Sequence, residues 1–307
     1  MIRPAPAVLA ALLILAGGSA PVWAAQKPAP GAPAPQAITA PTAADWRTPD
    51  PQDILVIDTN KGRILVELAP LAAPNHVARL RELTRKGLYD GRSFFRVIDA
   101  FMAQTGDPED RGTGGSDLPD LAAEFTFRRG ADPAFAPVTG SDRTYSRAAG
   151  VQLGMFGPFP VATQPDGQMF ATRDGKVDAT AWFCPGVVGA ARTGGDVNSA
   201  NSQFFIMTGE NPDLNGQYTV WGHVVGPMDA VLALQPGAAG SGTVPEATRD
   251  SMVRVRIASD IPEAERPSAQ VLDVRSPRFA QIVEERRAAR GAQFSICDIT
   301  LPAQISN

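Results

Sequence analysis

The sequence predicts a mainly β fold in which short strands form a barrel or a sandwich capped by helices. Three observations support this prediction. Short runs rich in β-branched and aromatic residues recur between residues 54 and 257, turn-forming residues separate them, and two well-separated stretches have helical periodicity.

The first elements have the clearest signals. Residues 54–59 and 63–68 are β-rich runs joined by Asn60-Lys61-Gly62, which favours a turn, so they predict a hairpin. Pro74 suits the first position of a helix, and Gly87 suits the position just after its end. Apolar residues recur at helical spacing between them, at Val77, Leu80 and Leu83.

The later elements are shorter. We predict strands at 94–98, 101–104, 204–207 and 218–225, and a short helix at 227–234. A glycine-rich loop spans residues 106–115. Residues 253–257 alternate strictly between apolar and basic side chains, which predicts a half-exposed strand that could close the sheet.

The N-terminus is typical of an export signal. Arg3 precedes an unbroken apolar run at 7–16, and Val22-Trp23-Ala24 offers small residues for cleavage, so residues 1–24 are predicted to be a signal peptide. A membrane anchor is the alternative, but the run is shorter than the ~20 residues that span a bilayer. We expect no stable membrane anchor after cleavage. Residues 25–52 are rich in Ala and Pro, which predicts an extended, solvated linker.

The composition limits the classes of function. The 307-residue chain is 44% hydrophobic, enough for one large domain with additions or for two smaller ones. Its net charge of −4 argues against a nucleic-acid-binding surface. Two His and two Cys, scattered along the sequence, are too few for most metal sites. We therefore expect no metal and no cofactor.

Several segments carry a family resemblance. Residues 94–107 read Phe-Phe-Arg-Val-Ile-Asp-Ala-Phe-Met-Ala-Gln-Thr-Gly-Asp, and residues 202–206 read Ser-Gln-Phe-Phe-Ile. Together with residues 186–193, 214–216 and 220–222, they resemble the signature elements of the cyclophilins. The segments follow one another along the chain in the same order as in that family. An unrelated ligand-binding β-barrel would not match both signatures in order. The resemblance covers residues 53–261.

This resemblance implies a closed antiparallel β-barrel capped by two helices, and peptidyl-prolyl cis-trans isomerase activity. The reaction needs neither a covalent intermediate nor a cofactor. The expected substrates are proline-containing peptides or unfolded exported proteins, and the signal peptide predicts a periplasmic location. The alternative is a non-catalytic peptide-binding or chaperone module on the same fold.

Two residues are implied to be catalytic. Rotation about an X–Pro bond faces a barrier of ~18–20 kcal/mol because the amide is conjugated. A fixed guanidinium can stabilise a nitrogen whose lone pair has left conjugation. Arg96 matches the family residue with that role, and Gln104 matches the Gln that steadies the Arg and binds the substrate. Their presence argues against the non-catalytic alternative.

The resemblance also implies the substrate-binding residues. An apolar slot for the proline ring matches Phe101, Met102, Phe205 and Leu214, as an apolar lining is typical of small-ligand sites. The groove for the residues before proline matches Ala191, Arg192 and Gln203. The sequence departs from the family pattern at Phe95, Thr105, Ala190, Asp213 and Tyr218. Asp213 stands where many members have a rim Trp that binds cyclosporin, which puts the outer rim of the pocket in doubt.

Two segments are additions to the expected fold. Residues 128–183 are an insertion with little clear periodicity but many apolar side chains, so they form either a subdomain beside the groove or a cover for one barrel end. Residues 262–307 are a C-terminal extension with one helix between Ser276 and Gly291, which could pack on the barrel. Each addition contributes a cysteine, Cys184 and Cys297. Export would permit a disulfide between them, but two separate buried thiols fit the sequence equally well.

Overall fold

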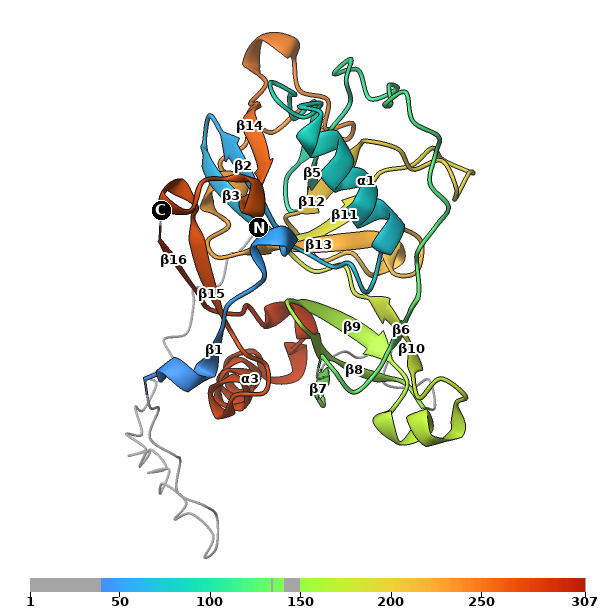
Figure 1. Ribbon diagram of the computed structural model, residues 1–307, viewed down its shortest axis with the longest axis vertical. Helices are drawn as coiled ribbons and strands as arrows, with labels where there is room; N and C mark the ends of the chain where they lie inside the picture. Colours follow the sequence, from blue (N-terminus) through green and yellow to red (C-terminus); the bar gives the residue numbers. More distant parts are fainter. Residues whose placement is uncertain (1–39, 134, 141–149, 307) are drawn as a thin grey trace, which may run out of the picture. The chain divides into compact units, whose positions relative to one another are not determined.

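The computed structural model describes residues 40–133, 135–140 and 150–306 (Figure 1). The predicted signal peptide and residues 25–39 of the predicted linker lie outside this part of the chain. Among the described residues, no helix is both long enough and apolar enough to cross a membrane.

The central element is a curled antiparallel sheet of eight strands (Figure 1). In spatial order these are β14 (Met252–Ile257), β2 (Ile54–Thr59), β3 (Gly62–Leu68), β13 (Val220–Val225), β11 (Val187–Ala190), β12 (Phe204–Met207), β5 (Met102–Thr105) and β4 (Arg96–Ile98). The predicted hairpin is β2 and β3, and the predicted strand 204–207 is β12. The other predicted strands are found with ends shifted by one or two residues.

Backbone contacts join the two edges of this sheet. The residues just before β4 pair with those just before β14, through an isolated bridge between Ser93 and Ser251. The backbone N–H of Phe94 donates to the carbonyl of Asp250 at 2.8 Å. These contacts bring the two edges of the curled sheet together, which agrees with the barrel that the resemblance implied.

Two helices cap the barrel core. Helix α1 (Pro74–Arg85) buries Val77, Leu80 and Leu83 against the barrel residues, as its periodicity predicted. The Glu124 carboxylate accepts hydrogen bonds from the backbone N–H groups of Asn75 and His76, both at 3.1 Å, and so satisfies free donors at the start of this helix. The short helix α2 (Asp229–Leu232) packs into the same core through Ala230 and Val231.

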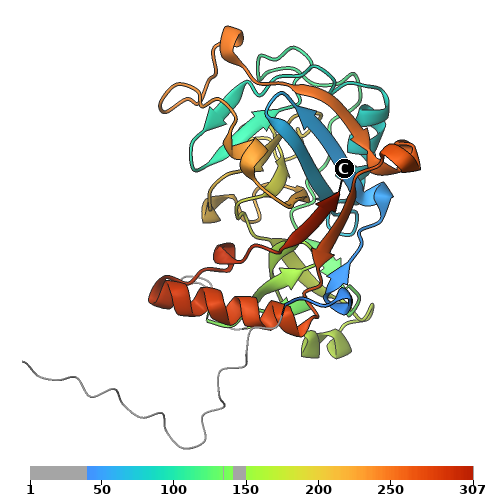
Figure 2. The same cartoon turned by 90° about the vertical axis from the view of Figure 1, so that its left-hand side faces the viewer.

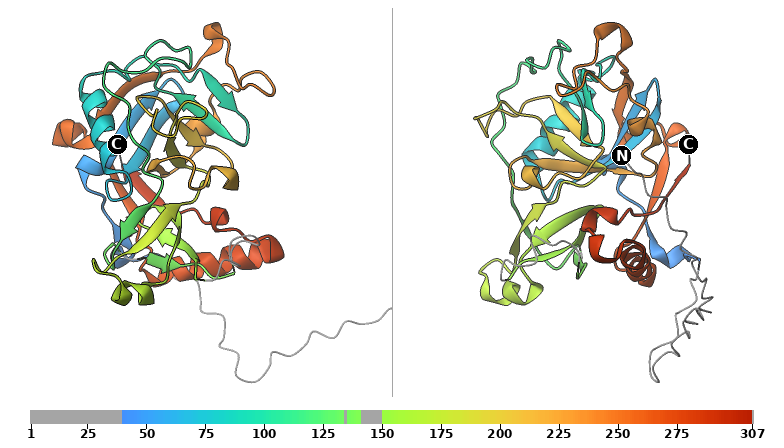
Figure 3. Two further views of the ribbon diagram at one scale, coloured as in Figure 1. Left: turned by 90° about the vertical axis from the view of Figure 1, so that its right-hand side faces the viewer. Right: turned by 180° about the vertical axis from the view of Figure 1, so that it is seen from behind.

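The insertion forms a five-stranded antiparallel sheet, drawn in green and yellow-green in Figure 3. Its strands, in spatial order, are β6 (Phe127–Arg129), β10 (Val177–Ala181), β9 (Phe159–Thr163), β8 (Gln152–Phe156) and β7 (Phe135–Pro137). The sequence predicted no strands here, because the runs are short and the residues that bury them come from other segments.

Aromatic packing and one buried cation organise the insertion. The Phe127 ring lies 5.5 Å from Phe156 and 6.4 Å from Phe159. The fully buried Arg129 side chain donates to Thr163 Oγ1 at 2.7 Å and pairs with Asp166 at 2.7 Å. A buried charge needs such partners, and these contacts tie β6 to the end of β9 and to the turn after it.

The prediction of an extended, solvated linker up to residue 52 was wrong for its last part. Strand β1 (Trp46–Arg47) pairs with β15 (Ser268–Leu272), which also pairs with β16 (Ala303–Ser306) in a three-stranded sheet. The Arg47 guanidinium makes two hydrogen bonds, of 2.6 and 2.8 Å, to the Glu67 carboxylate on β3. Residues after Ala40 therefore join the fold because a strand from the far end of the chain pairs with them.

The predicted C-terminal helix is α3 (Pro277–Arg290), shown in red in Figure 2. Ser276 caps it by accepting from the Phe279 N–H, and Gly291 follows its last turn. Its apolar stripe packs into a core that it shares with the insertion, and Arg287 Nη2 donates to the Thr139 carbonyl. The helix thus lies against residues 136–139 of the insertion, whereas the sequence had suggested packing on the barrel.

Candidate active site

Three of the predicted site residues, Arg96, Gln104 and Phe205, form one row across the sheet with a glycine beside them. Arg96 on β4 lies opposite Gln104 on β5, Gln104 lies opposite Phe205 on β12, and Phe205 lies opposite Gly189 on β11. Directly paired residues of an antiparallel sheet project from the same face. Because residues 96 and 104 flank one tight turn, the motif itself brings the first pair together, whereas only the sheet brings in Phe205 and Gly189.

The guanidinium of Arg96 is held from two sides. Its Nη1 donates to Gln104 Oε1 at 3.2 Å, and its Nε donates to the backbone carbonyl of Ser241 at 3.0 Å. Ser241 lies in a loop that is fixed against β4, since the Val97 N–H donates to the Gly242 carbonyl at 2.8 Å. A half-buried cation with two of its donors engaged keeps one orientation, as preorganised electrostatics require.

Gln104 is oriented by a second hydrogen bond. Its Nε2 donates to Gln203 Oε1 at 3.0 Å, and Gln203 Nε2 donates to the carbonyl of Gly114 at 2.8 Å. In this chain both amide oxygens accept and both amide nitrogens donate, which is consistent with the orientation of the two side chains. Three of the sequence-predicted residues, Arg96, Gln104 and Gln203, are therefore brought into one network.

A buried carboxylate shapes the glycine-rich loop that carries Gly114. Asp107 accepts hydrogen bonds from the backbone N–H groups of Glu109 at 2.8 Å, Arg111 at 3.0 Å and Gly114 at 3.1 Å, and also from Gly112. Burial raises the pKa of Asp107, but these backbone donors together outweigh it and hold the pKa below its usual value. The carboxylate therefore stays ionised and keeps the loop closed around it.

The four residues predicted for the proline slot belong to one apolar cluster or pack against it. Met102 and Phe205 are buried, and Phe101 and Leu214 are half-buried. Phe101 is fixed in the turn between β4 and β5, where its carbonyl accepts from the N–H of Thr208 at 2.9 Å. Leu214 ends a 3₁₀ turn, η4 (Pro212–Leu214), that Asn211 caps.

The Phe205 ring lies over a glycine and beside two other rings. A Cβ at Gly189 would lie 2.7 Å from Phe205 Cζ and 3.0 Å from Phe183 Cε1, so only glycine fits beneath the rings. The Phe183 ring stacks on Phe205 at 6.0 Å, and the Tyr218 ring meets Phe205 edge-on at 5.6 Å. Phe205 is therefore held in one orientation by aromatic packing.

The residues predicted for the neighbouring groove also lie together. The Ala191 N–H donates to the Gln203 carbonyl at 2.9 Å. Both residues and Arg192 line a cavity of about 510 Å³ that also borders Gln104. The Arg192 guanidinium lies 4.5 Å above the Tyr218 ring and donates from Nε to the Gln217 carbonyl at 3.1 Å. Arg192 thus links this cavity to the Tyr218 ring that packs against Phe205.

The structure also shows contacts that sequence reasoning missed. Ser241 and Gly114 act through backbone carbonyls, which leave no signal in side-chain identity. Gly189 and Phe183 support Phe205. The only sequence signal for them is the Gly-Val-Val-Gly segment that ends at Gly189 and the aromatic residue shortly before it.

Asp213, predicted at the rim, is exposed in η4 beside Leu214. In the described part of the chain, no cluster of three or more His, Cys, Asp or Glu side chains could hold a metal ion.

Sequence comparison identifies the family that this chain matches. The sequence model of the family described as "Cyclophilin type peptidyl-prolyl cis-trans isomerase/CLD" matches residues 54–258. A probable peptidyl-prolyl cis-trans isomerase of Brucella suis is 35% identical over 223 residues, covering 69% of this chain and 85% of the relative. Its counterpart in Brucella abortus is 34% identical over the same shares of both chains.

A solved structure shares the architecture. The crystal structure of cyclophilin AquaCyp293 from Hirschia baltica matches with a TM-score of 0.72 at 33% sequence identity, covering 87% of this chain and 98% of that chain. The matched part is longer than residues 54–258, so the likeness extends beyond the segment that the family model covers.

Proposed function

This chain belongs to the cyclophilin-type peptidyl-prolyl cis-trans isomerases, and we propose that Arg96 and Gln104 catalyse the rotation of X–Pro bonds in exported proteins and peptides. The observation that carries the proposal is the hydrogen-bonded network of Arg96, Gln104 and Gln203 beside the buried Phe205.

The chemistry requires positioning and charge rather than bond formation. As the X–Pro bond rotates, its nitrogen leaves conjugation and its lone pair becomes available to a donor. The Arg96 guanidinium, fixed by Gln104 and Ser241, offers a donor that needs no rearrangement when the lone pair develops. No residue has to accept or release a proton, so turnover should depend little on pH between 6 and 8.

The apolar residues predicted for the slot suit the proline ring. Phe101, Met102, Phe205 and Leu214 offer apolar surface, and burying a ring there favours binding by ~25 cal/mol per Å². The preceding residues of the substrate would enter the cavity lined by Gln203, Ala191 and Arg192. Proline-containing peptides are therefore the proposed ligands.

We also propose that the enzyme works outside the cytoplasm, in the periplasm. Its N-terminal residues fit an export signal, and the Cys184–Cys297 disulfide is of the kind that persists in oxidising compartments. Expression of the full chain in a Gram-negative host, followed by fractionation and N-terminal sequencing, tests this. We expect a periplasmic protein that begins at Ala25, and an uncleaved cytoplasmic protein would contradict it.

The catalytic proposal is tested with the purified mature protein and a peptide containing one Ala–Pro bond. Magnetisation-exchange NMR should show rapid cis-trans exchange at catalytic enzyme concentrations. Binding of the peptide without faster exchange would instead support the alternative, a non-catalytic peptide-binding module on the same fold.

A further inference from the structure

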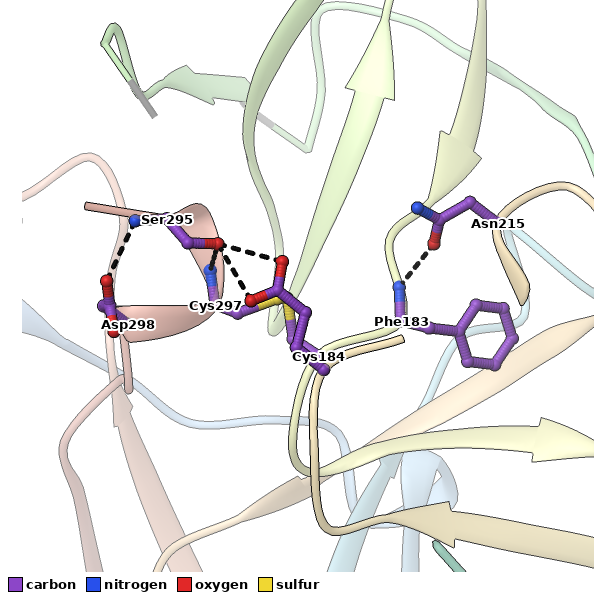
Figure 4. Close-up of a disulfide and its surroundings, with 7 residues drawn as sticks. Phe183, Cys184, Asn215, Ser295, Cys297 and Asp298 are labelled. Carbon is purple, nitrogen blue, oxygen red and sulfur yellow. Dashed lines mark hydrogen bonds between the residues drawn. A yellow bond between two sulfur atoms is a disulfide. The ribbon is translucent and has the colours of Figure 1, made fainter. Parts of the chain in front are cut away.

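The disulfide joins the C-terminal extension to the segment that enters the active site. Cys184 follows the insertion and leads into β11, and it is bonded to Cys297 in the 3₁₀ turn η9 (Ile296–Asp298). The sequence left this bond and two free thiols equally open. Cys184 is buried, and the close-up in Figure 4 shows it next to Phe183, which supports the Phe205 ring.

The backbone of Phe183 is tied to the loop that carries Leu214. Its N–H donates to Asn215 Oδ1 at 2.8 Å (Figure 4). Its carbonyl accepts from the Asn211 N–H at 3.0 Å. These two bonds bracket Leu214 in sequence, so the position of Phe183 sets the position of that part of the slot.

A second link joins the extension to the same loop. Ser295 Oγ donates to the Glu210 carboxylate, at 3.1 and 3.2 Å to its two oxygens. The same hydroxyl accepts from the Cys297 N–H at 3.2 Å, and the Ser295 N–H donates to Asp298 at 2.9 Å (Figure 4). Because Ser295 caps η9, the loop is anchored to the extension at Glu210 as well as through the disulfide.

We propose that the C-terminal extension is a positioning element of the active site, which holds the Leu214 wall and the Phe183 support of the proline slot through the Cys184–Cys297 bond and the Ser295–Glu210 contact. This inference rests on the proposed function of the slot. It assigns a role to residues 295–298, which lie outside residues 54–258, the segment that the family model matches.

The proposal predicts which kinetic constant the extension controls. Arg96 and Gln104 are held by Ser241 and Gln203, and neither of those contacts passes through the extension. Loosening the loop should therefore weaken binding of the proline ring and leave the polar network intact. The expected result is a higher KM and peptide Kd with little change in kcat.

The test compares variants of the mature full-length protein. Replacing both cysteines, Cys184→Ser with Cys297→Ser, should raise the Kd for the Ala–Pro peptide by about 3- to 10-fold and keep kcat within about 2-fold. Ser295→Ala should raise the Kd by about 2- to 3-fold, and Ser295→Thr, which keeps the hydroxyl, should restore it. Arg278→Ala is the matched control, because it removes an ion pair within α3 that does not contact the loop.

Binding is measured by NMR titration, so the result does not depend on turnover. Unchanged Kd and KM in the folded double-cysteine variant would overturn the proposal, as would a loss of kcat alone. If that variant does not fold, the Ser295 pair decides: equal Kd values for the wild type and Ser295→Ala would overturn it. Failure of the proposed function itself has a different signature, namely undiminished turnover in Arg96→Ala.

Discussion

Arg96 and Gln104 face each other across β4 and β5, and the bond from Arg96 Nη1 to Gln104 Oε1 is 3.2 Å long. The amide of Gln104 is itself fixed by Gln203, the residue just before β12. The guanidinium is thus positioned through Gln104 and Gln203, and its other anchor, the Ser241 carbonyl, comes from a loop far along the chain.

Removing this guanidinium should abolish most of the activity without unfolding the protein. We expect Arg96→Ala to reduce kcat/KM about a hundredfold or more, the typical loss for one preorganised donor, about 3 kcal/mol. Arg96→Lys keeps the charge but cannot donate to Gln104 and Ser241 with the same geometry, so it should also be impaired. NMR exchange rates test this, and near-wild-type turnover in a folded Arg96→Ala protein would refute the assignment.

The glycine beneath Phe205 should be essential for the shape of the slot. In Gly189→Ala the new methyl group would lie 2.7 Å from Phe205 Cζ, so the ring must move. We expect a loss of stability of about 1–3 kcal/mol and roughly tenfold weaker turnover. Gly167→Ala in the insertion is the control, since its Cβ would meet no atom within 4 Å. Equal effects of the two substitutions on turnover would contradict this account of Phe205.

Stability should fall as the pH drops below 6.5, partly through His223. Burial lowers the pKa of His223 to about 4 in the folded state, so the unfolded chain takes up a proton at a higher pH than the folded chain. The stabilisation from neutral His223 is complete above pH 6.5 and is lost as the pH falls towards 4. Between pH 8 and pH 5 this contributes a loss of about 2 kcal/mol.

Denaturant unfolding at the two pH values measures the effect. His223→Gln cannot titrate, so its free energy of unfolding should change less between pH 8 and pH 5 than that of the wild type. The carboxylates are common to both proteins and cancel in the comparison. If both proteins lose the same free energy over this range, His223 is not the group responsible.

The exposed Asp213 should make the enzyme weakly sensitive to cyclosporin. An ionised carboxylate accepts hydrogen bonds only, so it cannot replace the indole donor that many cyclophilins place at the rim. We expect Asp213→Trp to tighten cyclosporin binding about tenfold or more with little change in turnover, since the slot beneath is unaltered. Titration of the drug into the activity assay tests this, and stoichiometric inhibition of the wild type would show that another residue forms the rim.

The elements predicted correctly are those whose signals are local. The hairpin of β2 and β3 is specified by two β-rich runs and a turn, and α1 and α3 by a proline at their first position, an apolar stripe and a glycine after their ends. The strand alternation at 253–257 was only partly right. A bulge between Met252 and Arg254 turns Val253 outwards, where it is 59% exposed, and no local signal announces it.

The sequence by itself determined the family, the barrel and the pair of polar residues Arg96 and Gln104. The motif places these two residues on two strands joined by one turn. Only the tertiary structure decided what surrounds them. The five-stranded insertion, the pairing of β1 with β15 and the disulfide over a sequence separation of 113 depend on contacts between distant segments. Such pairings are selected by the burial and hydrogen bonding of the whole fold, and a local stretch of sequence does not contain its partner.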